Sequence, residues 1–291
     1  MTTALSRQLG SAFELTLTIP WPEVKAVYDQ VFNELASQIE IEGFRKGNAP
    51  KDLVAAKVDK NKVYSEVINR LLPDSYAKAL EEHRLQPIVS PKVQIVSADE
   101  EKDWQFLVKA AEKPKVDLQD YKSAVAALNS KGKIWTPDSA SATDKPGTPD
   151  PAKTEEQKSK RLREIIDKLL ETSRVELPEI LLESEVSRLL TQLIDDVRQA
   201  GLTYEQYLTS SGQTAEQIRE KYRAQAEASL KLEFVLTAVA DDLGIQVSPE
   251  EISAVIDKET DPQKKQSLKE QSYLLSSIIR RENTVNRLLA L

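Results

Sequence analysis

Hydrophobic and polar positions alternate near the start of this chain. Phe13, Leu15, Leu17 and Ile19 are separated by Glu14, Thr16 and Thr18, and a period of two predicts a strand with one buried face. Shorter alternations at residues 93–95 and 104–108 predict two further strands. The first third of the chain is therefore expected to contain a small sheet.

Helical spacing separates the predicted strands. Apolar residues recur every three or four positions over residues 24–39, which predicts a helix starting near Glu23. A second helical pattern starts at Pro50, and a third covers residues 63–80, with Pro73 expected to kink or break it. This order of elements, one strand followed by helices and then two strands, predicts a compact α+β domain over residues 1–113.

The character of the sequence changes after Lys113. Residues 136–154 are rich in proline, serine and threonine and contain no large apolar side chain, so they cannot bury enough surface to offset the entropy of ordering. Residues 114–135 contain a few apolar side chains, and the pattern there predicts no firm structure. We therefore expect a linker over residues 114–154.

Residues 155–291 form an all-helical pattern. Pro178 opens one helix, and a long one is expected from about Ala215 to Leu243. The stripe of apolar residues on this long helix is broad and irregular, so a strict two-stranded coiled coil is not expected. Capping signals are expected at Thr214 with Gln217 and at Ser248 with Glu251, and helix ends at Gly201, Gly212 and Gly244.

Composition narrows the functional classes. The formal net charge of −7 over 291 residues argues against general nucleic-acid binding, so DNA is not expected as a partner. The absence of cysteine excludes disulfides and thiolate metal sites. Residues 1–10 lack the apolar run of a secretory signal, and no stretch has the ~20 apolar residues of a membrane span. We expect a soluble, cytoplasmic protein with no membrane partner.

Catalytic chemistry is scarce in the sequence. The single histidine, His83, lies among charged residues and is typical of a solvated helix end. The neighbouring acids Asp195 and Asp196 diverge around a helix and suit a solvated face. No nucleophile elbow, zinc-protease motif or phosphate-binding loop occurs. The sequence therefore predicts no catalytic residue, no metal site, no cofactor and no enzymatic activity.

One short motif stands out from this background. Residues 43–50 read Gly-Phe-Arg-Lys-Gly-Asn-Ala-Pro, and lysines outnumber acidic residues over the stretch that follows, up to Lys62. Glycine permits a tight, extended presentation of the residues between, and a cluster of cations on an acidic protein can steer docking onto a negatively charged partner. The candidate docking residues are Gly43, Phe44, Arg45, Lys46, Gly47 and Pro50.

The Gly-Phe-Arg-Lys-Gly-x-x-Pro string, placed between two helices, resembles the ribosome-docking signature of the trigger factor family of bacterial chaperones. Residues 87–93, 116–122 and 177–185 also resemble family segments, in the same order along the chain. The resemblance implies an elongated multidomain protein, with an α+β amino-terminal domain joined by a linker to an all-α, SurA-like carboxy-terminal domain over residues 155–291.

This sequence departs from the family pattern at one place. Most members carry an FKBP-type prolyl isomerase domain after the Asp-Tyr-Lys stretch, and such a domain needs ~100 residues. Only residues 123–154 are available here, without alternating strands. The resemblance therefore implies a form that lacks the isomerase domain, whether by nature or by engineering.

By resemblance, the protein is an ATP-independent chaperone that docks beside the nascent-chain exit and shields apolar segments of new polypeptides. Its partners would be ribosomal protein and RNA, nascent and unfolded polypeptides, and a second copy when the protein is free. Alternatives are a ribosome-independent, SurA-like holdase or assembly adaptor, and residual prolyl isomerisation. Apolar candidates for client contact, with core packing as an equal alternative, are Leu274, Leu275, Ile278, Ile279, Val285 and Leu288.

Overall fold

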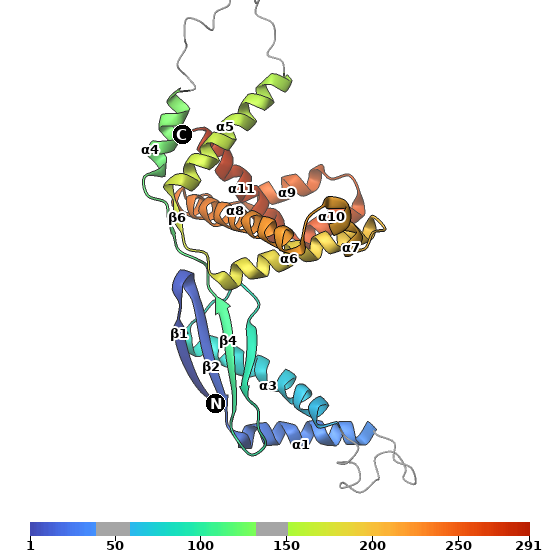
Figure 1. The fold of residues 1–291 in the computed structure, drawn as a ribbon. Helices are drawn as coiled ribbons and strands as arrows, with labels where there is room; N and C mark the ends of the chain where they lie inside the picture. Colours follow the sequence, from blue (N-terminus) through green and yellow to red (C-terminus); the bar gives the residue numbers. More distant parts are fainter. Residues whose placement is uncertain (39–58, 132–150) are drawn as a thin grey trace, which may run out of the picture. The chain divides into compact units, whose positions relative to one another are not determined.

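A computed structural model describes residues 1–38, 59–131 and 151–291, which contain mostly helices and a small antiparallel sheet (Figure 1). Contacts divide the chain into two units. The first comprises Met1–Lys113 with Pro178–Ser184, and the second comprises Pro114–Leu177 with Glu185–Leu291. The fold is the expected combination of an α+β part and an all-helical part. No described helix is long and apolar enough to cross a bilayer.

The first unit is built on a four-stranded antiparallel sheet in the order β1-β2-β4-β3. Its strands are β1 (Thr2–Arg7), β2 (Ala12–Ile19), β3 (Lys92–Ser97) and β4 (Trp104–Ala111). The alternation at residues 13–19 and 104–108 is confirmed, because every second residue of β2 and β4 is buried. Sequence patterning did not predict β1, whose residues TTALSR contain too few apolar side chains to show a period of two.

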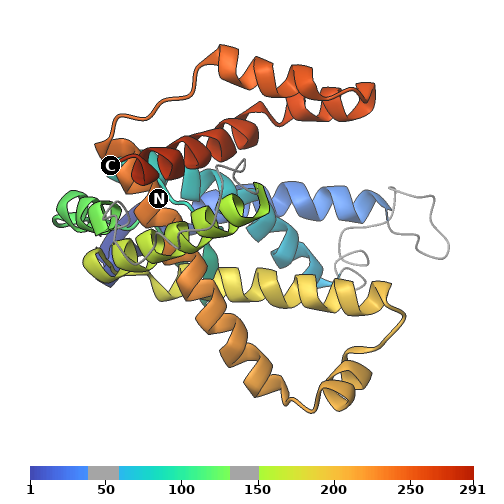
Figure 2. The same ribbon diagram turned by 90° about the horizontal axis from the view of Figure 1, so that it is seen from above.

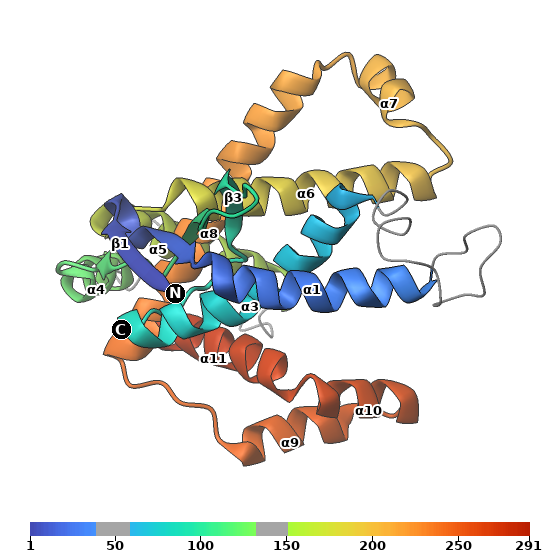
Figure 3. The same cartoon turned by 90° about the horizontal axis from the view of Figure 1, so that it is seen from below.

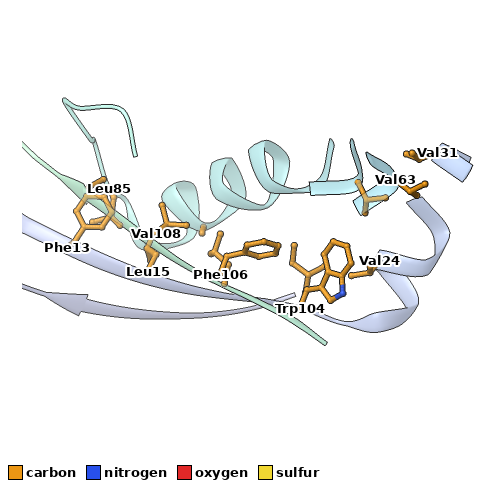
Figure 4. Packing of buried hydrophobic residues seen from close by; sticks show 14 residues of the cluster. Phe13, Leu15, Val24, Val31, Val63, Leu85, Trp104, Phe106 and Val108 are labelled. Atoms are coloured by element: carbon orange, nitrogen blue, oxygen red, sulfur yellow. The ribbon is translucent and has the colours of Figure 1, made fainter. Parts of the chain in front are cut away.

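Two helices, α1 (Trp21–Gln38) and α3 (Lys60–His83), cover the apolar face of this sheet. Trp104 and Phe106 pack against helix residues in the core that Figure 4 shows. The helix α3 continues through Pro73, where sequence patterning predicted a kink or break. Buried Val63 and Val67 precede the proline and buried Ala79 follows it, so packing on the sheet supports both halves of the helix and outweighs the lost hydrogen bond.

The second unit begins inside the expected linker. Strand β5 (Val116–Asp117) pairs with β6 (Arg174–Val175), and helix α4 (Tyr121–Lys131) packs against α5 (Pro151–Thr172). The core around them also draws on α8 (Ala215–Asp242) and α11 (Ser272–Leu289). Its buried members are Tyr121, Val125, Ile165, Leu169, Val235, Leu236, Val239 and Leu288. Residues 116–131 are thus part of the helical unit.

Two helical arms extend this core (Figure 2). One arm contains α6 (Glu179–Gln199), α7 (Tyr204–Ser211) and the first part of α8, packed around Leu193, Val197 and Ile218. The other contains α9 (Pro249–Lys258), α10 (Pro262–Glu270) and α11, packed around Ile256, Leu275 and Ile279. Figure 3 shows α9 and α10 beside α11.

The capping signals in the sequence are confirmed. Thr214 and Ser248 form capping boxes at the starts of α8 and α9, and Thr203 forms a third box with Gln206 at the start of α7. Gly201 and Gly212 adopt positive φ values of 75° and 64° where α6 and α7 end, a conformation that glycine adopts without strain.

Candidate functional site

The motif of residues 43–50 lies outside the described residues, as do its candidate docking residues Gly43, Phe44, Arg45, Lys46, Gly47 and Pro50. What the structure describes is the pair of helices that flank it in sequence. Helix α1 ends at Gln38 before the motif, and α3 begins at Lys60 after it. Asp59 caps α3 by accepting a hydrogen bond from the Asn61 backbone N–H at 2.9 Å.

An ion-pair cluster fastens α1 to α3. Arg70 donates from Nη1 and Nη2 to the two carboxylate oxygens of Glu34, at 3.1 and 2.7 Å, and from Nε to Glu66 at 3.2 Å. The hydrogen bond from Arg70, aided by its charge, lowers the pKa of Glu34. A two-pronged pair of this kind has a defined geometry, and it links the two helices at the surface, beside the core that packs them together.

Aromatic rings link α1 and α3 to the sheet. The ring of Tyr28 lies 6.2 Å from that of Phe32 and 5.7 Å from that of Tyr64, and Tyr64 packs edge-on against Trp104 at 5.6 Å. Burial raises the pKa of both Tyr28 and Tyr64. Aromatic pairs contribute about 0.5–1.5 kcal/mol beyond area burial. The described parts of α1 and α3 are therefore anchored on the core of the sheet.

A second candidate region is the start of α11. Leu274 and Ile278 are 55% and 54% exposed, whereas Leu275 and Ile279, one residue further on, are buried against α9 and α10. Leu288 is fully buried in the core of the second unit, and Val285 is half-buried. Of the six apolar residues named from the sequence, Leu274 and Ile278 are the two with most of their surface free.

A pocket of about 460 Å³ adjoins these two side chains between α8 and α11. Its walls include Leu236 and Ala240 of α8 and the exposed Leu274 and Ile278 of α11. Tyr273, which is 90% exposed, adds a ring that the sequence analysis did not single out. We name Tyr273, Leu274 and Ile278 the α11 patch.

Charged side chains share the lining of this pocket with the α11 patch, namely Glu233, Arg280 and Arg281. Arg280 donates to Asp241 at 2.7 Å and to the Ile245 carbonyl at 2.8 Å, which ties α11 to the end of α8. In the described parts of the chain, histidine and acidic side chains do not gather in threes as metal ligands would. The region offers apolar contact and hydrogen bonding, which is the chemistry of a binding surface.

Two family models match the chain, and both describe the bacterial trigger factor protein. The first matches residues 1–132, and the second, for the carboxy-terminal part, matches residues 150–290. The chain belongs to the trigger factor family. The boundary between the models falls between α4 and α5, which pack against each other in the second unit.

Curated trigger factors resemble this chain at modest identity. The trigger factor of Staphylococcus epidermidis strain RP62A is 22% identical over 385 aligned positions, which cover 89% of each chain. That of Streptococcus suis strain 05ZYH33 is 35% identical over 114 residues, covering 39% of this chain and 27% of the relative. The alignment of 385 positions exceeds the 291 residues present here, so the Staphylococcus trigger factor contains residues without a counterpart in this chain.

A solved trigger factor structure has the same fold. It comes from work on promiscuous substrate recognition in the folding and assembly activities of the trigger factor chaperone. It superposes on 100% of this chain and 99% of its own length, with a TM-score of 0.66 and 16% sequence identity. At this identity the likeness establishes the fold, and the function of individual residues has to be argued from the chain itself.

Proposed function

We propose that this trigger factor family member docks on the ribosome through residues 43–50 and shields apolar segments of nascent chains, in the cytoplasm and without ATP. The observation that supports docking most strongly is the motif's position in the sequence, between helices α1 and α3. The Arg70 cluster links these two helices to each other, and the aromatic rings anchor them to the sheet. A docking loop gains from fixed flanking helices because less entropy is lost on binding.

The cations of the motif supply the electrostatic part of the proposal. Arg45 and Lys46 would bind ribosomal RNA phosphates or acidic protein groups, while Phe44 would add an apolar contact. Of the lysines that follow the motif, Lys60 is 3.5 Å from Glu100 within the first unit. Docking carried by cations weakens as salt rises, because bound counterions are released on association.

Ribosome co-sedimentation tests this docking. We expect the triple variant Phe44→Ala, Arg45→Ala, Lys46→Ala to lose ribosome binding at low salt, and the unmodified protein to lose it progressively as salt is raised. The control variant Lys78→Ala, Lys102→Ala removes two exposed cations of the same unit outside the motif, and it should sediment as the unmodified protein does. Unchanged sedimentation of the triple variant would remove the docking proposal.

We assign client contact to the α11 patch. Its side chains are apolar and largely free, and the pocket beside it has a volume suited to an apolar side chain of a client. Weak apolar contacts exchange readily, so a client can leave as it folds without a nucleotide-driven step. Leu275, Ile279 and Leu288 are assigned to packing because the structure buries them.

Aggregation of an unfolded model protein, followed by light scattering, tests the α11 patch. The variant Leu274→Ser, Ile278→Ser should suppress aggregation several-fold less well than the unmodified protein. The matched control is Ile194→Ser, Leu202→Ser, which removes two other exposed apolar side chains of the second unit. Equal loss in both variants would show that general surface apolarity, and not this patch, carries the activity.

The proposal includes no isomerase step. The matched family models leave only residues 133–149 between them, a stretch shorter than a small catalytic domain. A proline-limited refolding assay tests this directly, with an FKBP enzyme as the positive control. Acceleration of refolding comparable to that enzyme would contradict the proposal.

A further inference from the structure

The pocket between α8 and α11 is long for its volume. Its lining includes Leu274 and, further along the same helix, Thr284, and ten residues of helix separate these two by about 15 Å along the axis. On α8 the lining runs from Glu233 to Ala240, a separation of about 10 Å. Its volume of about 460 Å³ lies within the range of small-molecule sites. We call this pocket the α8–α11 groove, and its proportions suit a single extended chain.

Apolar and cationic side chains follow one another along α11. Leu274, Ile278 and Arg281 are spaced by four and then three residues in one continuous helix, so they share a face of it. All three line the α8–α11 groove. The groove therefore presents exposed apolar surface first and a cation about one helical turn further on.

Arg281 is the cation of this lining that is not committed to another side chain. Its neighbour Arg280 is held by Asp241 at 2.7 Å. Among the described residues, no ion pair joins Arg281 to an acidic side chain, and Arg281 is exposed. Glu233, the acidic residue of the described lining, lies near enough to Arg188 of α6 for their charges to interact. The groove thus has a cation available for an anionic group.

The aliphatic hydroxyls of the lining already donate to their own helices. Thr237 donates to a carbonyl oxygen of α8 at 2.8 Å, and Ser277 and Thr284 each donate to a carbonyl oxygen of α11 at 2.7 Å. A peptide backbone lying along this wall would find few donors for its carbonyl groups, which are costly to leave unpaired. An alkyl chain has no polar group to satisfy, so it fits the apolar part of the groove better.

We propose that the α8–α11 groove binds a free medium-chain fatty carboxylate. Its alkyl chain lies along Leu274 and Ile278, where each buried methylene adds affinity, and its carboxylate pairs with Arg281, whose planar guanidinium matches the two oxygens. A single chain accounts for the limited volume, whereas a membrane lipid carries two. The bound carboxylate covers two members of the α11 patch and so competes with clients. This competition rests on the proposed client contact, but the binding itself does not.

Isothermal titration calorimetry with decanoate, below the concentration at which it forms micelles, tests the charge. We expect Arg281→Gln to raise the dissociation constant about tenfold, the loss of one charge-assisted pair. The matched control Arg219→Gln removes an exposed arginine of α8 that lies outside the lining, and it should bind as the unmodified protein does. Decanol has the same chain without the carboxylate and should bind Arg281→Gln and the unmodified protein equally.

The apolar wall is tested separately from the charge. The variant Leu274→Ser, Ile278→Ser should weaken the binding of decanoate and of decanol alike. Octanoate, which is shorter by two methylenes, should bind the unmodified protein about tenfold more weakly than decanoate does.

The consequence for clients is measured by light scattering. Decanoate should reduce the suppression of aggregation by the unmodified protein, and the reduction should be smaller in Arg281→Gln. Saturable binding of decanoate without any change in suppression would leave the fatty carboxylate site standing and contradict client contact at the α11 patch.

Four results would overturn the inference. They are the absence of saturable decanoate binding, equal losses of affinity in Arg281→Gln and Arg219→Gln, an equal loss for decanol and decanoate in Arg281→Gln, and undiminished decanoate binding in Leu274→Ser, Ile278→Ser. Association with phosphatidylglycerol vesicles in place of free decanoate would identify a membrane surface as the partner and would also overturn it.

Discussion

Leu17 lies in the middle of the buried row of β2, opposite Phe106 of β4, and it is fully buried. Truncating it leaves a cavity in close-packed surroundings, so we expect Leu17→Ala to lower the free energy of unfolding by about 2–5 kcal/mol. Its neighbour Thr16 points to the opposite face and is half-buried, and Thr16→Ala should cost under about 1 kcal/mol. Urea titration followed by tryptophan fluorescence measures both, and equal costs would contradict the assignment of faces.

The contact between Tyr121 and Asp242 makes the stability of the second unit depend on pH in both the acidic and the alkaline range. Tyr121 donates to Asp242 at 2.7 Å, and Lys122 lies 2.8 Å from the same carboxylate. Hydrogen bonds from Lys122 and Tyr121 lower the pKa of Asp242 below its ordinary value of 3.8. Burial, and then the hydrogen bond to Asp242, raise the pKa of Tyr121 well above 10.

The signs of these shifts give a pH prediction. The contribution of Asp242 is present above its unfolded pKa and is lost as pH falls through the lowered folded value, below about 3.8. The contribution of Tyr121 is present below about pH 10 and is lost only as pH rises through its raised value. Absorbance at 295 nm should show fewer tyrosines ionising near pH 10 in the folded protein than after unfolding. Burial raises the pKa of other tyrosines as well, so Tyr121→Phe should reduce this difference by one tyrosine without removing it.

At the scale of secondary-structure elements, the helix caps set where the long helices start. The Thr214 hydroxyl oxygen accepts a hydrogen bond from the Gln217 backbone N–H at 3.2 Å, and the Thr214 backbone N–H donates one to the Gln217 side-chain oxygen at 2.9 Å. We expect Thr214→Ala to lower the free energy of unfolding of the second unit by about 1 kcal/mol, and Thr214→Ser to leave it nearly unchanged. Thermal unfolding followed by circular dichroism compares the two variants, and equal loss in both would mean that the cap has no role.

Elements with a local signal could be predicted from the sequence, and elements that depend on distant partners could not. Strands β2 and β4 showed their alternation, and the caps at Thr214 and Ser248 follow from short motifs. Strand β1 is polar, and it forms because it pairs antiparallel with β2. Helix α4 is short and alanine-rich, and its burial comes from α5, α8 and α11, far away in sequence.

The candidate sites also combine features with a local sequence signal and features that depend on distant parts of the chain. The motif of residues 43–50 is visible in the sequence, but the ion pair from Arg70 to Glu34 that links its flanking helices requires knowledge of how α1 and α3 pack. On α11, Leu274 and Ile278 share one face while Leu275 and Ile279 share the next, and both faces are apolar. Sequence alone cannot say which face is packed, because that depends on where α9 and α10 lie.

At the scale of the whole molecule, the two units differ in the sequence separation between the residues that form their cores. Among the described residues, the core of the first unit is formed by residues between Leu5 and Ala110. The fragment of residues 1–113 should therefore unfold cooperatively on its own in urea, with native-like circular dichroism. A fragment without a cooperative transition would show that Pro178–Ser184 is required.

The second unit needs the residues once expected to be a linker. A fragment of residues 114–291 contains all members of its core, whereas residues 151–291 lack Tyr121 and Val125 and leave Ile165, Leu169 and Leu288 uncovered. We expect the longer fragment to unfold cooperatively and the shorter one to be markedly less stable and to bind a dye for exposed apolar surface. Equal stability of the two would show that α4 is dispensable.

The buried amide of Asn129 has a consequence for how this protein is made. It accepts two hydrogen bonds from Arg161 and donates one to the carbonyl oxygen of Leu288, 159 residues further along the chain. Leu288 is made after every other buried member of this core, so the first unit can fold during synthesis while the second must wait for α11. A protein proposed to guard unfinished polypeptides is thus an unfinished one itself until α11 has been made.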